Sequence, residues 1–291
     1  LLVMKFEASS RLVAALTLFR TGGAIMQDTE NLKKIYNFAY TYLEQRSQDL
    51  NLKTPLTKYF FPLYDIFDSS KNPTLDLVFE RILVSLQNRS YMPNVIKFDQ
   101  DKAKILSALE LTSPYNFQKF ATNNIENLLA KLKNSKEFTD KNQFKKSWKT
   151  WLKGAVDGAK WLSEFNNLEE FKSSLGGQHS FNPDIPQKIS KKITGFGFAL
   201  ACDFLKELGF INYGKPDVHL INIFKGLKLI DNNTSEQEVL CIIKEMADSV
   251  NVPAYQVDKI FWLIATENFY LDLSQPLSLR DKFIKSYSTK E

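Results

Sequence analysis

Residues 185–224 read IPQKISKKITGFGFALACDFLKELGFINYGKPDVHLINIF, and this stretch decides both the fold class and the candidate site. Apolar residues recur in it at helical spacing, with short breaks between the runs. The helical runs cover about 184–193, 198–209 and 216–227. Gly195 and Gly197 separate the first two runs, and glycine permits positive φ and a close backbone approach. The stretch predicts two short helices joined by a glycine hairpin and followed by a third helix.

The hairpin has features of a phosphate site. The helix that starts near Phe198 directs unpaired N–H groups and its positive dipole end toward the hairpin. Lysines at 188, 191 and 192 precede it and add positive charge. Such a site would hold a nucleic-acid backbone without reading its sequence. A plain pair of helices joined by a glycine turn explains the same residues, and both interpretations stay open at this point.

The third run begins with Gly214-Lys215-Pro216-Asp217-Val218-His219. Pro216 suits the first helical position, and Asp217 then lies in the first turn, where the helix dipole stabilises a carboxylate. That stabilisation also accounts for Asp217 without any chemistry.

Together these elements resemble the helix-hairpin-helix-GPD superfamily of DNA base-excision glycosylases, which includes the endonuclease III and 8-oxoguanine DNA glycosylase types. The signature is a G-x-G hairpin, a helix, a Gly/Pro loop and an aspartate. It covers about 40 residues. By this resemblance Asp217 is the catalytic carboxylate that stabilises the oxocarbenium-like sugar. The resemblance also implies that Gly195 and Gly197 bind a DNA phosphate and that His219 lies near the DNA backbone.

One position departs from the family pattern. Bifunctional members carry a nucleophilic lysine two residues after the second glycine, where this chain has Ala199, 18 residues before Asp217. The departure implies a monofunctional glycosylase that uses water. Two alternatives stay open: a lysine from elsewhere, with Lys192 and Lys215 nearest in sequence, or a degenerate member that binds DNA without cutting it.

A second, smaller resemblance lies at 83–89, where a helix ends in a polar cluster. Family members place here a side chain that fills the gap left by the flipped base. The candidates are Gln87, Asn88 and Arg89. A polar helix end explains the same residues.

The rest of the chain also reads as helical, so the fold class expected is all-α. Further helices are expected at about 30–50, 73–87, 100–110, 115–133, 142–163, 166–175 and 253–268, and another that begins at Ser235. Thr54-Pro55 resembles a helix start, and Ser235 with Glu238 forms a capping-box pattern.

The resemblance implies two helical subdomains with the site in a cleft between them. A helical barrel at 75–215 would end in the helix-hairpin-helix at 185–209. An N-terminal segment at 1–74 would pack with C-terminal helices at 216–291. Residues 1–28 include the apolar run LVAALTLF, which faintly resembles a signal peptide, and we interpret it as an amphipathic helix or an extension.

Composition sets further limits. The chain has 291 residues, 44% of them hydrophobic, and a net charge of +5, so it can bury a sizeable core. No apolar run approaches the ~20 residues of a membrane helix. A lysine-rich stretch at 131–153 contains Phe144, Trp148 and Trp151; it reads either as a solvated helix face with an aromatic core stripe or as a DNA-facing surface.

Two cysteines and two histidines leave too few ligands for a cysteine-held Fe–S cluster or a multi-histidine metal centre. We therefore expect no metal and no cofactor, and a reducing compartment such as the bacterial cytoplasm. The partner expected is double-stranded DNA, bound by a monomer. Asp203, Asp258 and Lys259 are interpreted as surface or capping charges. Phe198, Trp151, Trp161 and Trp262 could stack on a base, but aromatic residues at helical spacing are interpreted first as core residues.

Overall fold

The computed structural model describes residues 28–289 except 69, 71, 90, 91, 93, 94, 112–116, 139, 141–143, 145 and 273–279. Every regular element in this part of the chain is helical, which confirms the all-α prediction. The expectations about residues 1–27 lie outside the described residues. The helices are α2 (Thr29–Asp49), η2 (Leu56–Tyr59), α3 (Leu75–Gln87), α4 (Phe98–Ala108), α5 (Phe117–Ala121), α6 (Ile125–Asn134), α7 (Lys146–Leu162), α8 (Leu168–Ser174), α9 (Ile185–Lys192), α10 (Phe198–Leu208), α11 (Val218–Gly226), α12 (Glu236–Ser249), α13 (Ala254–Thr266) and α14 (Arg280–Ser288).

Side-chain caps set many of the helix starts. The Ser235 hydroxyl accepts a hydrogen bond from the backbone N–H of Glu238, whose carboxylate reaches back to the Ser235 N–H, so the predicted capping box is confirmed. Thr74 caps α3 and Asn167 caps α8 in the simpler way, by accepting one N–H. These starts follow from local chemistry.

Three expected boundaries were wrong. The Thr54-Pro55 start leads only to the four-residue 3-10 helix η2. The expected helix at 115–133 is two helices, because the Asn124 side chain accepts the N–H of Glu126 and starts α6 afresh. Pro216 is not the first helical residue, since the Asp217 side chain itself caps a helix that begins at Val218.

The apolar side chains form two separate cores. One, the core of the middle lobe, is built from residues between 67 and 213 together with Leu240 of α12. The other, the core of the terminal lobe, joins residues 32–60 to residues 220–287, so both ends of the described chain share it. Trp148 and Trp151 of α7 point into the middle core, whereas the α7 lysines are exposed.

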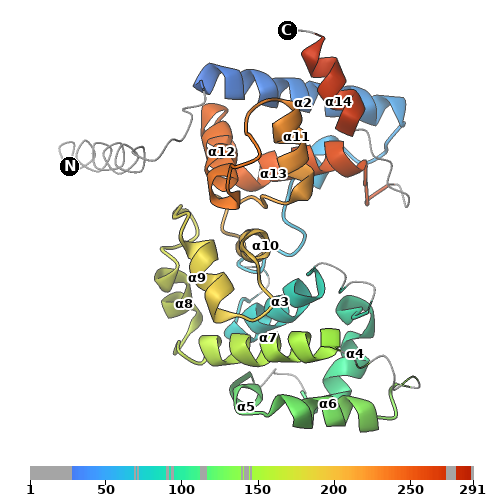
Figure 1. Ribbon diagram of the computed structural model, residues 1–291, viewed down its shortest axis with the longest axis vertical. Helices are drawn as coiled ribbons and strands as arrows, with labels where there is room; N and C mark the ends of the chain where they lie inside the picture. The colour runs from blue at the N-terminus through green and yellow to red at the C-terminus, as the bar shows by residue number, and fades with distance from the viewer. Residues whose placement is uncertain are drawn as a thin grey trace, which may run out of the picture.

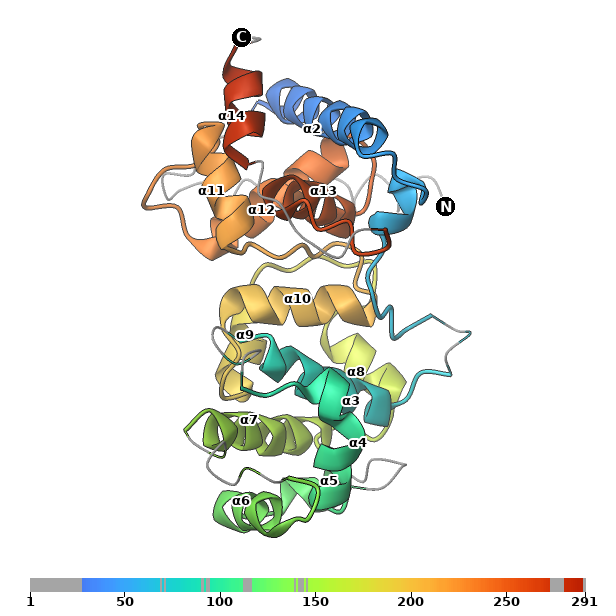
Figure 2. The ribbon, with the colours of Figure 1, turned by 90° about the vertical axis from the view of Figure 1, so that its right-hand side faces the viewer.

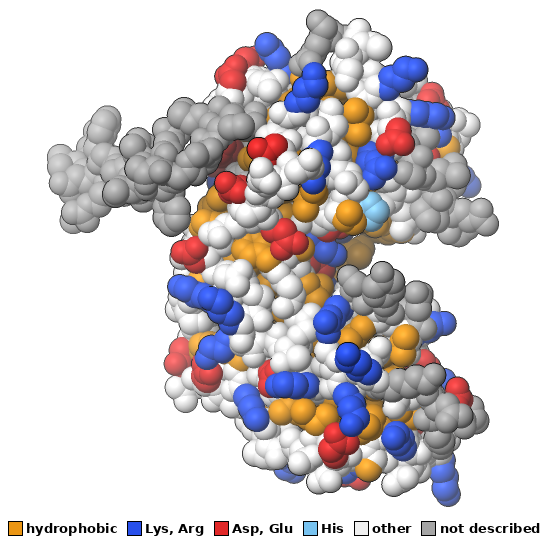
Figure 3. Space-filling model, in the orientation of Figure 1, with side chains coloured by type: hydrophobic (Ala, Val, Ile, Leu, Met, Phe, Trp, Pro, Cys, Tyr) orange, Lys and Arg blue, Asp and Glu red, His pale blue; other side chains and the backbone are white. Residues whose placement is uncertain are grey.

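The two lobes lie one above the other, with α10 between them (Figure 1). The view turned by 90° shows α10 lying across the molecule between α3 on one side and the terminal lobe on the other (Figure 2). The surface is hollowed on the right-hand side where the lobes face each other, and Lys and Arg side chains gather on the lower, middle lobe (Figure 3). None of the helices described is both long and apolar enough to span a lipid bilayer.

Candidate functional site: a glycine turn, a capping aspartate and a buried ion network

The turn between α9 and α10 depends on one glycine. Gly195 has φ +99°, a left-handed conformation that only glycine adopts without strain, and the turn closes with the Phe196 N–H donating to the Ile193 carbonyl at 3.1 Å. Gly197 is the N-cap of α10 with φ −96°, and a Cβ there would meet nothing within 4 Å. The sequence allowed positive φ at both glycines, and the structure uses it only at Gly195.

The turn is held in place by α7. A Cβ on Gly154 would lie 2.3 Å from the Thr194 carbonyl oxygen and 2.5 Å from Leu86, so only glycine lets the turn approach α7 this closely. Asp157, one turn further along α7, accepts a hydrogen bond from the Thr194 backbone N–H at 3.1 Å. The turn is therefore packed against α7 as part of the middle lobe.

Gly154→Ala should destabilise the protein and displace the turn. The added methyl group must push away a backbone carbonyl and Leu86, and overpacking of this kind costs about 1–3 kcal/mol. Chemical denaturation at neutral pH measures the change. Gly197→Ala serves as the control, because its position is open and its φ is ordinary; it should cost clearly less. Equal losses in the two variants would contradict the close approach.

Backbone N–H groups at this turn remain available. Those of Gly195, Gly197 and Phe198 donate no hydrogen bond to a described residue. The next N–H, that of Ala199, donates to the carboxylate of Glu236 in the first turn of α12. An anion at this helix end would therefore be held by the turn rather than by Ala199.

The lysines that precede the turn differ in their partners. Lys188 and Lys191 are exposed, and neither pairs with a described acid within 4.0 Å. Lys192 is also exposed but pairs with Glu164, at 2.7 and 3.0 Å to the two carboxylate oxygens. Lys191 therefore brings free positive charge to this end of α9.

Asp217 caps α11. Its Oδ1 accepts the backbone N–H groups of His219 at 2.9 Å and Leu220 at 3.3 Å, while Oδ2 accepts none from a described residue. The carboxylate is half-buried, and His219 follows it in the first turn of α11, also half-buried. One oxygen thus fixes the group, and the other is left to interact with a ligand.

The segment that leads to Asp217 is fastened against the terminal lobe. A Cβ on Gly214 would lie 2.8 Å from Ile243 of α12 and 3.1 Å from Asp258 of α13, so this glycine permits the close packing. The Asp217 backbone N–H then donates to the Lys215 carbonyl at 2.8 Å. Tertiary packing and a local turn together determine where the carboxylate lies.

Burial raises the pKa of the Asp217 carboxyl group, and the negative charge of Asp258 raises it further. Lys215, His219 and the hydrogen bond from the Leu220 N–H act in the opposite direction. The net shift is upward. Groups whose pKa is raised by burial beside charged neighbours are frequent in functional sites.

The predicted wedge residues lie where α3 ends. Gln87 is buried, and its side chain is engaged at both ends by Asp99: the amide donates to Oδ2 at 2.9 Å and its oxygen accepts the Asp99 N–H at 3.1 Å. Asn88 and Arg89 are exposed, and Arg89 Cδ lies 3.9 Å from the place of a Cβ on Gly195. Arg89 is thus the exposed side chain beside the turn, Asn88 is exposed next to it in the chain, and Gln87 is buried.

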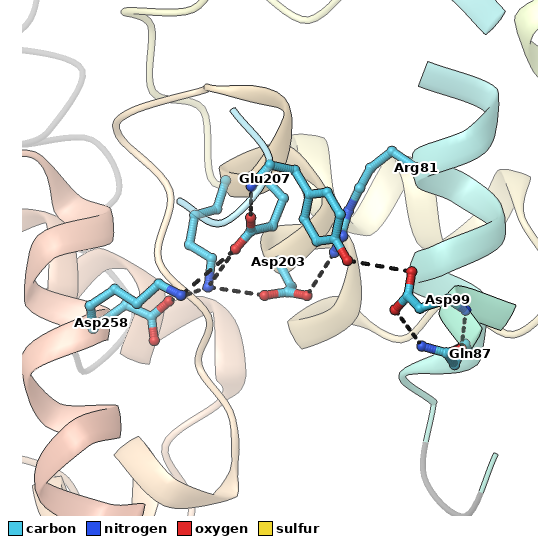
Figure 4. A network of polar contacts seen from close by, with 9 residues as sticks. Arg81, Gln87, Asp99, Asp203, Glu207 and Asp258 are labelled. Atoms are coloured by element: carbon cyan, nitrogen blue, oxygen red, sulfur yellow. Dashed lines mark hydrogen bonds and ion pairs between the residues drawn. The ribbon is translucent and has the colours of Figure 1, made fainter. Parts of the chain in front are cut away.

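A buried ion network lies between the lobes (Figure 4). The Lys206 ammonium on α10 contacts Asp258 of α13 at 2.7 Å and Asp203 at 2.9 Å. Arg81 of α3 reaches Asp203 at 3.4 Å, and its guanidinium lies over the Tyr64 ring at 4.4 Å. Each of these charged residues is at most 7% exposed.

The assignment of Asp203, Asp258 and Lys259 to the surface was therefore wrong. All three are buried. Asp203 pairs with Arg81 of α3, and Asp258 and Lys259 of α13 pair with Lys206 and Glu207 of α10. Sequence reasoning also missed Arg81, Lys206 and Glu207. A signal was present: Asp203, Lys206 and Glu207 recur at three- and four-residue spacing on one helix face, and their opposite charges suit mutual pairing.

The network holds its charges by mutual compensation. Burial opposes ionisation of Asp203, yet the positive charges of Lys215, Lys206 and Arg81 keep its pKa well below the ordinary range. Burial likewise opposes the charge on Lys206, but Asp258, Asp203 and Glu207 raise its pKa. Burial and the neighbouring charge of Lys206 lower the pKa of Lys259.

Comparison of the chain with protein-family models, with curated proteins and with solved structures found no match in any of the three. In the described part of the chain, no group of three His, Cys, Asp or Glu side chains could hold a metal ion.

Proposed function

We propose that this protein is a DNA glycosylase that cleaves the N-glycosidic bond of a damaged or modified base flipped out of duplex DNA. The observation that carries the proposal is the Asp217 carboxylate: one oxygen is fixed by two backbone N–H groups, the other is unengaged by described residues, and the group is half-buried. A fixed anion in a water-poor site stabilises a developing sugar cation effectively.

In this proposal α9, the glycine turn and α10 act as a helix-hairpin-helix that contacts the DNA backbone. The free N–H groups of Gly195 and Gly197 bind a phosphate, and Lys191 adds positive charge. His219 lies two residues after Asp217, in the first turn of α11, and contacts the DNA backbone in this proposal. The DNA then lies in the hollow between the lobes, with Asn88 or Arg89 filling the gap left by the flipped nucleotide.

The reaction proposed is hydrolytic. Ala199 offers no amine, so the base first departs with the electrons of the glycosidic bond and takes up a proton from solvent, and water then attacks C1′ of the sugar. Asp217 stabilises the cation between these events and can accept the proton that the water releases. The products are a free base and an abasic site in an intact strand.

Ala199 also favours a second candidate, a DNA-binding protein on this scaffold that performs no cleavage. Its affinity for duplex DNA would fall steeply with salt, as for any protein that neutralises phosphates. Base release separates the two candidates.

The test uses end-labelled duplexes that carry 8-oxoguanine, uracil, alkylated purines or oxidised pyrimidines, each divided into untreated, alkali-treated and borohydride-treated samples. Strand breaks that need alkali, without a trapped complex, are expected. Breaks without alkali together with a trapped complex would instead show an amine nucleophile, and Lys215→Met against Lys192→Met would then locate it. Salt-dependent binding without base release from any duplex would support the DNA-binding protein that performs no cleavage. Neither binding nor base release would contradict both candidate functions.

A further inference from the structure

Two ion pairs cross from one lobe to the other inside the network. Lys206 of α10 contacts Asp258 of α13 at 2.7 Å, and the neighbouring Glu207 lies 3.9 Å from Lys259, the residue after Asp258. Two consecutive residues of α10, a cation and then an anion, thus pair with two consecutive residues of α13, an anion and then a cation. The two pairs therefore join α10 to α13 at adjacent positions.

Asp258 links these pairs to the candidate catalytic residue. Its Cβ lies 3.1 Å from the place where a side chain on Gly214 would begin, so the segment ending at Asp217 rests directly on it. Lys206, on the other side of Asp258, holds that side chain from α10. α10 is also the helix that begins at the glycine turn.

We propose that Lys206 is a positioning residue: by holding Asp258 across the lobe interface, it fixes the segment behind Asp217 and sets the electrostatic environment of that carboxylate. The inference rests on the proposed catalytic role of Asp217. In this proposal the network does more than hold the lobes together: it also influences the charge of the Asp217 carboxylate, which Lys206 does not contact.

The charges that act on Asp217 come from each side. Asp258 faces it from α13, Lys215 from the preceding segment, and His219 from α11. Among them only Asp258 is negative, and Lys206 is its ion-pair partner within hydrogen-bond distance. Removing the Asp258 charge should therefore favour ionised Asp217, and removing the Lys206 charge should disfavour it.

The test follows the Asp217 carboxyl carbon by ¹³C NMR in the full chain without DNA, with the signal assigned through Asp217→Asn. In Asp258→Asn the titration midpoint of Asp217 should move to lower pH, and in Lys206→Met to higher pH, each by on the order of one unit. Lys206→Arg, which keeps the charge, should restore the midpoint toward that of the parent. Lys192→Met, at an exposed ion pair, should leave it unchanged.

A network that only held the lobes together would not shift the Asp217 midpoint in opposite directions in Asp258→Asn and Lys206→Met. An Asp217 midpoint that stays unchanged in Asp258→Asn would overturn the proposal, even if base release fell in that variant. If Lys206→Met does not fold, Lys206→Gln replaces it, because glutamine also removes the charge while keeping an N–H donor for Asp258, and its midpoint should likewise lie above that of the parent. Because the titration needs no substrate, the expected shifts combined with no base release from any duplex would overturn the proposed glycosylase activity and support the electrostatic coupling.

Discussion

Asp217→Asn should lower the rate of base release by about 10²–10³-fold while leaving the protein at least as stable as the parent. Loss of one preorganised electrostatic group in an active site costs about 10²–10³-fold in rate, and Asp217 is the charge proposed to face the sugar cation. Asparagine caps helices about as well as aspartate, so α11 should keep its start.

The expected effect on stability follows from the direction of the pKa shift. Because burial raises the pKa of Asp217 above its ordinary value of 3.8, the folded state holds the ionised form at a cost. That cost is fully present above the raised folded pKa and disappears as the pH falls below the unfolded value. Asparagine removes it, so the free energy of unfolding at neutral pH should be unchanged or higher.

Urea denaturation and the duplex assay, run on the same preparation, measure both quantities. Asp28→Asn is the matched control, since Asp28 caps α2 by accepting the Glu30 N–H in an exposed position. It should change neither base release nor stability appreciably. Full base release by Asp217→Asn would exclude Asp217 as the catalytic carboxylate, and a large loss of stability would show that its role is structural.

Lys206→Met should lower the free energy of unfolding by about 3–5 kcal/mol, the usual cost of removing one partner from a buried ion pair. The variant leaves Asp258 buried without its cation, whereas Asp203 keeps Arg81 at 3.4 Å. Since the pKa of Lys206 is raised, its contribution is complete at neutral pH and is lost only as the pH rises into the strongly alkaline range.

The control is Lys192→Met, which removes the same group from an exposed pair with Glu164 and should cost no more than about 1 kcal/mol. The double variant Lys206→Met/Asp258→Asn should recover part of the loss, because no unpaired aspartate charge remains. Urea denaturation at pH 7 provides all of these values. Equal stability of the Lys206 and Lys192 variants would show that water compensates the charges between the lobes.

Local chemistry made much of the fold predictable. Helical periodicity and the near absence of long breaks indicated an all-α chain, and the Ser235–Glu238 box starts α12 because its hydrogen bonds join residues three apart. Where local signals competed, boundaries were misplaced. Pro216 was expected as the first residue of the helix, but Asp217 is the N-cap of α11. Its carboxylate accepts the N–H groups of His219 and Leu220, so the helix begins after it.

The sequence by itself determined the all-α class, most of the helices and the presence of a carboxylate after the Gly/Pro loop. The structure showed that Gly195, and not Gly197, needs the freedom of glycine. Only the tertiary structure decided which charged residues are buried. Asp203 and Lys206 of α10 are buried where Arg81 of α3 pairs with Asp203 and Asp258 of α13 pairs with Lys206. The charge of Lys206 is compensated by Asp258, about 50 residues later in the chain. A local sequence pattern covers a few helical turns and does not reveal such a partner.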